Sequence, residues 1–243
     1  MLEPTERLYW QDDHCTECDA TVTAVRDHEL AFDRTCFYPG GGGQPADDGQ
    51  ILLSSGIGLQ VTGAKAEEDG VIWHAVSDAT SSVAPGERVR MIVNGERRRD
   101  LARYHTVLHV LNTIALQDYG AWITGAQIGV DYSRIDFRWD GFAPSLSQEL
   151  ECKVNSVLER DHPLRVYYVT EAEFRERPDL LRTLEVKPPV IGGRVRVVEI
   201  EGFDAQACGG THVATTAEVG RCSIYKTENK GRINKRLYVR LLS

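Results

Sequence analysis

The stretch that decides the fold is RRRDLARYHTVLHVLNTIALQDY, residues 97–119. Its apolar residues recur at spacings of three and four on two adjoining stripes, and two histidines, His105 and His109, lie in the same register. Gly120 follows directly, which is typical of a helix end. The stretch therefore predicts a helix that is buried on much of its surface.

Upstream of this helix, short apolar runs alternate with turn residues up to about residue 90, which predicts a small β-barrel or meander. We therefore expect an N-terminal domain over residues 1–92 and a second domain over 93–243. Within the first lies YPGGGGQPADDG, residues 38–49. Its glycines allow close backbone approach, positive-φ turns or N–H groups that face an anion, although a flexible hairpin connection explains them equally well.

Downstream, the pattern favours an α+β fold with a largely antiparallel sheet, because strands and helices do not alternate regularly. A strand is expected in SRIDFRWD, and Pro144 with the Ser145/Gln148 capping-box spacing predicts a helix at about 145–160. A shorter helical stretch is expected near 171–180. Further strands are predicted in LRVYYVT, RVRVVEI, VGRCSIYK and KRLYVRLL.

Composition is that of a globular protein, with 42% hydrophobic and 26% charged residues among 243. No apolar run approaches the roughly 20 residues that cross a bilayer, and the N-terminus lacks the pattern of a signal peptide. We therefore expect a cytoplasmic protein with no membrane association. In a reducing compartment the six cysteines are expected to be free thiols or metal ligands.

Two short motifs combine into a candidate metal site. His105 and His109 are four residues apart on the helix, so they project from one face. CGGTH, residues 208–212, adds Cys208 and His212. Each pair alone is weak, since two core histidines explain the first as well, but together they form a plausible tetrahedral set for Zn²⁺. Thr106 stands where a zincin helix carries its glutamate, so the helix supplies no general base.

Five segments of the chain carry a resemblance to one known family: FYPGGGGQPADDG at 37–49, HTVLH at 105–109, ITGAQIGVDYSRIDF at 123–137, GFDAQACGGTHV at 202–213 and KTENKGR at 226–232. Together they resemble the alanyl-tRNA editing proteins of the AlaX type, which are freestanding relatives of the editing domain of alanyl-tRNA synthetase. The resemblance runs over essentially the whole chain in the family's order and corresponds to the medium-length class. It implies an N-terminal β-barrel followed by the α+β editing domain shared with threonyl-tRNA synthetase, its second additional domain.

The resemblance also implies an activity. Such a protein is a trans-editing hydrolase, which deacylates tRNA(Ala) that carries serine or glycine. It implies one Zn²⁺ per chain, held by His105, His109, Cys208 and His212. Neither a membrane nor an obligatory protein partner is expected.

The substrate pocket is less well defined by the sequence, and no general base stands out. Discrimination of serine from alanine calls for a group that hydrogen-bonds the extra hydroxyl, for which Thr124 is the first choice and Gln44 the second. A zinc ion with four protein ligands has no open position. Either Cys208 is displaced during the reaction, or the metal orients the substrate and a neighbouring group guides the water. The pocket candidates are Thr106, Thr124, Gln127, Gln44, Asp204 and Gln206.

Charge is distributed unevenly along a chain of net charge −8. Residues 1–80 carry 15 acidic and 4 basic side chains, whereas residues 221–243 carry 7 basic residues and one acid. Basic clusters on both sides of the ligand pairs predict a transient contact with the tRNA acceptor stem. The tRNA-binding candidates are Arg97, Arg98, Arg99, Arg103, Lys226, Lys230, Arg232, Lys235 and Arg236, with Gly41, Gly42 and Gly43 of the glycine loop.

Two other functions are compatible with the same residues. A zinc-dependent hydrolase of small esters or amides would share the metal site without needing RNA. A non-catalytic, zinc-stapled RNA-binding module is also possible, because a closed four-ligand site is usually structural.

Overall fold

The computed structural model describes residues 2–77, 80, 83–183 and 188–242. The chain divides into two compact units. The first comprises Met1–Gly41 and Pro45–Arg99, and the second comprises Gly42–Gln44 and Asp100–Ser243. Three residues of the glycine loop therefore group with the second unit, although their chain neighbours belong to the first.

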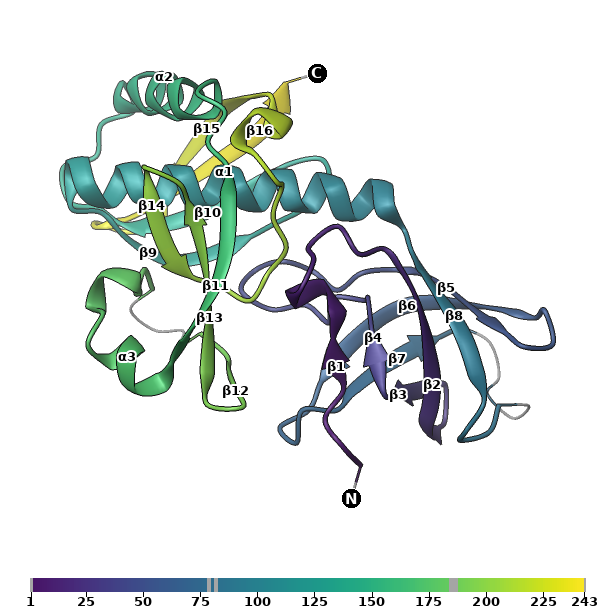
Figure 1. Cartoon of the computed structure of the whole chain (residues 1–243). Helices are drawn as coiled ribbons and strands as arrows, with labels where there is room; N and C mark the ends of the chain where they lie inside the picture. Colours follow the sequence, from purple (N-terminus) through teal and green to yellow (C-terminus); the bar gives the residue numbers. More distant parts are fainter. Residues whose placement is uncertain (1, 78–79, 81–82, 184–187, 243) are drawn as a thin grey trace. The chain divides into compact units, whose positions relative to one another are not determined.

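A closed antiparallel barrel of six strands forms the first unit, as the alternating apolar pattern predicts (Figure 1). Its interior is filled by apolar side chains, among them Phe32, Ile51 and Met91. The first unit also contains a separate two-stranded parallel sheet, formed by β1 (Glu6–Arg7) and β4 (Arg34–Thr35). In spatial order the barrel strands are β2 (Glu17–Arg26), β3 (Glu29–Phe32), β7 (Ile72–Val76), β6 (Gly58–Ala66), β5 (Gly49–Leu53) and β8 (Arg88–Val93).

The expected long helix is α1 (Gly95–Tyr119), which begins two residues before the predicted start. The side chain of Asn94 accepts a hydrogen bond from the Arg97 backbone N–H and so satisfies one free donor of the first turn. At the other end Gly120 adopts a φ of 63°, and its N–H donates to the carbonyl of Leu116. Between these ends the helix is buried on most of its surface in the core of the second unit, as predicted.

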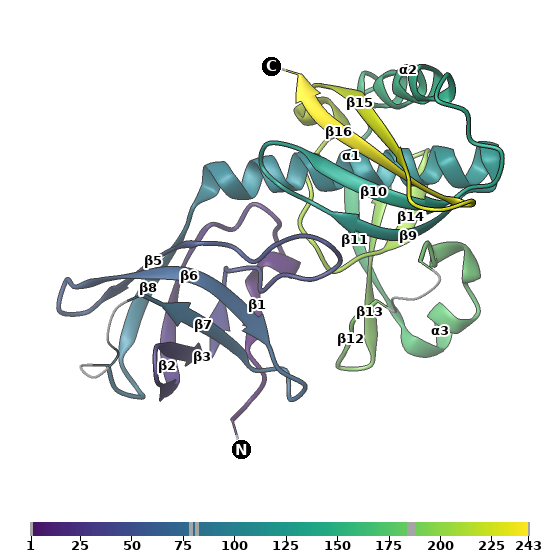
Figure 2. The same ribbon diagram turned by 180° about the vertical axis from the view of Figure 1, so that it is seen from behind.

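Two antiparallel sheets complete the second unit, which confirms the α+β prediction. Figure 2 shows the first sheet in front of α1, with its other face turned away from that helix. Its order is β15 (Arg221–Asn229), β16 (Asn234–Leu242), β10 (Ser133–Arg138) and β9 (Trp122–Gln127). The second sheet is built around β13 (Arg194–Ile200), which pairs with β11 (Leu164–Thr170), β12 (Val190–Ile191) and β14 (Asp204–Ala207).

The second helix, α2 (Leu146–Leu158), lies where it was predicted, but its predicted capping box is wrong. Ser145 already has helical dihedrals, with φ −62° and ψ −24°, and its side chain makes no capping bond. A preceding turn explains this, because the N–H groups of Leu146 and Ser147 already bond to the carbonyls of Ala143 and Pro144.

A capping box does open α3 (Glu171–Arg175), where Thr170 and Glu173 exchange hydrogen bonds. Short 3-10 helices lie at Leu8–Trp10, Pro178–Leu180 and Thr216–Val219. Among the described residues, no helix is long and apolar enough to cross a membrane.

Candidate metal centre

Helix α1 and the segment after β14 bring the four predicted ligands together. His105 and His109 are one turn apart on α1, with ring centroids 4.9 Å from each other. Cys208 follows β14, and its N–H donates to the carbonyl of Arg196 on the neighbouring strand β13. One ligand atom from each of His105, His109, Cys208 and His212 lies within 4.8 Å of the others.

The spacing of these atoms fits a tetrahedral zinc ion. Sγ of Cys208 lies 3.5 Å from Nε2 of His105 and 3.5 Å from Nε2 of His212. Zn–S and Zn–N bonds of about 2.3 and 2.05 Å place two tetrahedral ligand atoms about 3.6 Å apart. Three nitrogen donors and one sulfur donor also suit a borderline ion. The donor set and these two distances therefore suit zinc, and the four ligand atoms, which lie within 4.8 Å of one another, would move closer together around the ion.

Hydrogen bonds to the far ring nitrogens orient two of the histidines. Nδ1 of His105 lies 2.9 Å from Oε1 of Gln44, which can only accept, so this nitrogen carries the proton. Nδ1 of His212 lies 3.1 Å from Oγ1 of Thr106, whose own proton goes to the carbonyl of Ala102. In both rings Nε2 is therefore left with its lone pair toward Cys208, which is the tautomer that a metal needs.

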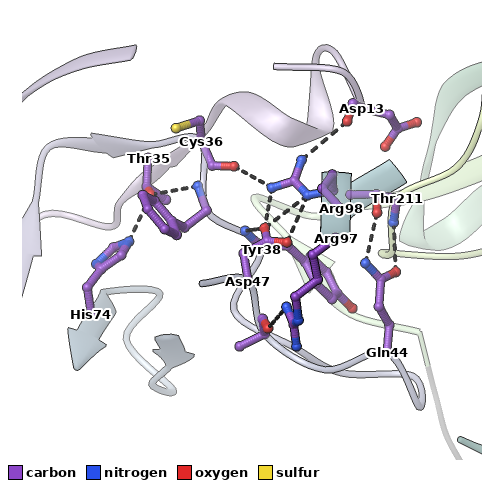
Figure 3. A network of polar contacts seen from close by, with 12 residues as sticks. Asp13, Thr35, Cys36, Tyr38, Gln44, Asp47, His74, Arg97, Arg98 and Thr211 are labelled. Carbon is purple, nitrogen blue, oxygen red and sulfur yellow. Dashed lines mark hydrogen bonds and ion pairs between the residues drawn. The ribbon is translucent and has the colours of Figure 1, made fainter. Parts of the chain in front are cut away.

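Gln44 is held on both ends of its amide, as Figure 3 shows. Nε2 donates to Oγ1 of Thr211 at 2.8 Å, and Oε1 accepts from the Thr211 N–H at 3.1 Å as well as from His105. The residue is 2% exposed. Its amide thus orients a candidate ligand, and its predicted role as a reader of the substrate hydroxyl stays a prediction.

Two glycines are required by close packing around this centre. A Cβ on Gly210 would lie 2.3 Å from Cε1 of His105, so no other residue fits there. A Cβ on Gly43 would lie 2.5 Å from the carbonyl oxygen of Ala126, and Gly43 also has a φ of 88°. The Gly43 carbonyl accepts from the N–H of Ile128 at 2.8 Å. Here the glycine loop serves close backbone approach, one of the uses its sequence allows.

Burial keeps the three imidazoles neutral. It lowers the pKa of His105 to about 3, with a further contribution from the positive charge of Arg196. Burial likewise holds the pKa values of His109 and His212 well below the usual 6.5, with additional repulsion from neighbouring histidines and Arg196. Neutral imidazole is the form that coordinates a metal.

Arg196 is a component that sequence reasoning missed. It is 1% exposed, and Nη1 donates to the carbonyls of Cys208 and Gly210 at 3.1 and 2.8 Å. It thereby fixes the backbone of the loop that carries the sulfur ligand. The one available signal was the position of a charged residue among valines in RVRVVEI.

The remaining pocket candidates lie in different environments. Gln206 is buried, and its amide bonds to the His109 carbonyl and Thr113 Oγ1 at 3.2 and 2.9 Å, so it supports α1. Gln127 is exposed and accepts from Nε of Arg134. Asp204 pairs with Arg182 through one oxygen, while its Oδ2 is buried without a partner among the described residues.

Thr124 is exposed on β9 at a β-bulge. Gly125 pairs with Asp136 and Ile123 pairs with Phe137, so Thr124 is the extra residue of the bulge. Bulges of this kind redirect a side chain out of the regular alternation of a strand. Thr124 therefore stays a candidate for contact with the substrate.

One predicted RNA contact is contradicted by the structure. Arg98 is 3% exposed, and its guanidinium forms an ion pair with Asp47, which is 1% exposed (Figure 3). It also donates to the carbonyls of Cys36 and Asp13 at 2.7 and 3.2 Å. Because every side of the group faces a partner within the first unit, Arg98 stabilises the barrel and is not available to a phosphate.

Lys235 is a second predicted RNA contact whose side chain is buried. It is 8% exposed, and its Nζ donates to the carbonyl of Arg232. Arg103 and Arg97 are half-buried and bond to the carbonyls of Val219 and Ala46.

The other basic candidates lie nearer the surface. Arg99 and Arg232 are exposed, and Arg236 pairs with Asp136. Lys226 and Lys230 share Glu228 as their ion-pair partner. In the glycine loop, Gly41, Gly42 and Gly43 are exposed and all have positive φ.

Comparison with known proteins matches both units. Residues 195–238 match the threonyl and alanyl tRNA synthetase second additional domain, and residues 12–97 match the class II (A) tRNA synthetases. An alanyl-tRNA editing protein AlaX-M of Methanosarcina acetivorans is 37% identical over 98% of this chain and 99% of its own length. That of Saccharolobus solfataricus is 34% identical over 96% and 98%. The alanine–tRNA ligase of Korarchaeum cryptofilum is 40% identical over 92% of this chain, which spans 25% of that ligase.

Proposed function

Because the chain belongs to the alanyl-tRNA editing proteins of the AlaX-M type, we propose that it removes serine, and also glycine, from mischarged tRNA(Ala) in a zinc-dependent hydrolysis. It is an aminoacyl-tRNA deacylase, and its proposed action is editing in trans. The bond it cleaves is the ester between the amino acid and the terminal ribose of the tRNA.

The observation that carries the zinc proposal is the convergence of His105, His109, Cys208 and His212. Their donor set, their spacing and the tautomers of two of them all suit zinc, which when bound would supply a Lewis acid for the ester carbonyl or for an attacking water. An aminoacyl ester is already activated, so its hydrolysis asks mainly for a positioned water and stabilisation of an oxyanion.

The side from which substrate approaches follows from burial. Three of the four ligands are buried, whereas Cys208 is only half-buried. The Cys208 sulfur accepts a hydrogen bond from the Gly210 backbone N–H at 3.4 Å. We therefore place the reacting ester beside Cys208, where displacement of the sulfur would open a coordination position.

Two further groups suit the amino acid itself. Oδ2 of Asp204 is an unpartnered acceptor among the described residues, which matches the ammonium group that every aminoacyl ester carries. The exposed hydroxyl of Thr124 matches the hydroxyl of serine. A hydrogen bond of this kind favours serine over alanine, because a bound ester would cover the Thr124 hydroxyl and alanine would leave that hydroxyl unpaired.

The test is deacylation of Ser-, Gly- and Ala-tRNA(Ala) by the wild type and by Thr124→Val. We expect the wild type to hydrolyse the serine ester fastest and to spare the alanine ester. Thr124→Val should lose preference for serine over glycine while it keeps its zinc. Equal rates on all three esters would contradict the proposed specificity, and an unaltered preference in Thr124→Val would remove that residue from the pocket.

A further inference from the structure

The outer face of the sheet β15-β16-β10-β9 carries three tyrosines in a row. The ring centroid of Tyr238 lies 6.0 Å from that of Tyr132 and 6.1 Å from that of Tyr225. Tyr132 and Tyr225 are 45% and 42% exposed. Large aromatic side chains are seldom left in water on a sheet without a partner, so this row requires an explanation.

Each tyrosine is directed outward by a separate feature of the backbone. On β16, Leu237 and Val239 are fully buried in the core, so Tyr238 between them points to the opposite face. A bulge between Ile224 and Lys226 lets Tyr225 join the same face.

The third tyrosine is positioned by a hydrogen-bonded loop. The hydroxyl of Tyr104 donates to the carbonyl of Asp131 at 2.8 Å and accepts from the Leu241 N–H at 3.2 Å. This ties the loop that carries Tyr132 to the end of β16. Close packing of Gly129 against the Tyr132 carbonyl holds the same loop.

Cations are interleaved with the rings. Nζ of Lys226 lies 4.8 Å from the ring centroid of Tyr238, and the guanidinium of Arg240 lies 4.6 Å from that of Tyr225. Arg134 is the cross-strand partner of Tyr238 on its other side. Apart from the buried Lys235, the four strands carry six basic residues and two acidic ones, in a chain whose net charge is −8. The two acids, Asp136 and Glu228, form ion pairs with Arg236, Arg134 and Lys226, and basic side chains remain in excess.

We propose that Tyr132, Tyr225 and Tyr238 form a stacking platform for single-stranded RNA, with Lys226, Arg134 and Arg240 binding its phosphates. Rows of exposed aromatic rings on a sheet stack successive bases, and adjacent cations neutralise the backbone. Duplex RNA cannot use the rings, because its base faces are covered by neighbouring bases. The surface is separate from the metal centre, and it rests on the proposed function only in taking aminoacyl-tRNA as its natural source of unpaired nucleotides.

Binding of unacylated RNA by the whole protein tests this directly, because it requires no hydrolysis. The probes are a fluorescent single-stranded RNA hexamer and a blunt RNA duplex of the same length. We expect the wild type to prefer the hexamer, and Tyr132→Ala and Tyr225→Ala each to weaken hexamer binding about tenfold. Tyr132→Phe and Tyr225→Phe should retain it, since stacking needs the ring and not the hydroxyl.

The control is Tyr168→Ala, which removes a comparably exposed tyrosine from β11 in the other sheet and should not alter hexamer binding. Zinc content verifies that every variant is folded around the metal centre. Equal hexamer affinity in the wild type and the alanine variants would overturn the platform. Self-association lost in the alanine variants, with RNA binding unchanged, would assign the face to a second copy of the chain and would also overturn it.

Failure of the platform and failure of the editing proposal give different results. If mischarged tRNA is not hydrolysed but the hexamer binds through the tyrosines, the editing proposal fails and the stacking platform is still supported. If hydrolysis proceeds and the alanine variants bind the hexamer as the wild type does, only the platform is lost.

Discussion

Oε1 of Gln44 accepts a hydrogen bond from Nδ1 of His105 at 2.9 Å, across 61 residues of sequence. The glycine loop thus supplies the side chain that sets the orientation of a candidate zinc ligand on α1. Outer hydrogen bonds of this kind tune metal affinity, because they fix the ring and its tautomer. The glycine loop and the His-x3-His motif therefore act as parts of one site.

We predict that Gln44→Ala lowers zinc affinity about 10- to 100-fold, because the His105 ring loses its fixed orientation. The measurement is competition for zinc with a chelator of known affinity. Gln117→Ala, which removes an exposed glutamine from the end of α1, is the control and should bind zinc as the wild type does. Unchanged affinity in Gln44→Ala would show that its bond to His105 has no role in metal binding.

We predict that Gly210→Ala disrupts the metal centre, since its Cβ would lie 2.3 Å from the His105 ring. Overpacking of this kind destabilises by about 1–3 kcal/mol and should displace His105 from its ligand position. Zinc stoichiometry and thermal unfolding measure both effects. Gly63→Ala is the control, because nothing lies within 4 Å of its added Cβ and its φ is ordinary. A Gly210→Ala protein with full zinc content would contradict the packing.

Two neighbouring arginines should differ in their contribution to the stability of the first unit. Arg98→Ala leaves the buried carboxylate of Asp47 without its partner and should destabilise the first unit by about 3–5 kcal/mol. Arg99→Ala removes an exposed side chain and should leave stability within about 0.5 kcal/mol of the wild type. Denaturant unfolding of both variants gives the comparison. Equal stability of the two would mean that the Arg98–Asp47 pair makes no net contribution.

The elements and residues of this protein differ in how far the sequence predicts them. Local periodicity predicts α1 and the barrel strands, and residue type with spacing predicts the four candidate metal ligands. The sequence does not predict the hydrogen bonds of Gln44 and Arg196, because they join strands and loops far apart in the chain. Arg98 was read as a surface cation because a basic run carries no sign of which side chain turns inward.

Stability of the barrel should fall in mild acid because of His74. This residue is fully buried, with Nδ1 facing the Leu30 carbonyl and Nε2 facing the Thr35 hydroxyl, which also accepts from the Phe37 N–H. Burial lowers its pKa from 6.5 to about 4. The unfolded chain therefore takes up a proton at a higher pH than the folded chain, so the stabilising effect is complete above pH 6.5 and declines as the pH falls from 6.5 toward 4.

Across that interval His74 should account for a loss of about 3 kcal/mol. The measurement is urea unfolding of the wild type and His74→Gln between pH 7 and pH 4. The glutamine variant starts less stable but should lose less stability with acid. Parallel pH profiles for the two proteins would show that His74 is not the source of the acid sensitivity.

The central claim is that hydrolysis of mischarged tRNA(Ala) depends on one zinc ion held by His105, His109, Cys208 and His212. Its most direct test is Ser-tRNA(Ala) deacylation by metal-free protein titrated with zinc, alongside His109→Ala. We predict that activity returns in proportion to zinc and saturates at one ion per chain, whereas His109→Ala stays inactive. Full activity in metal-free protein, or in His109→Ala, would contradict the account.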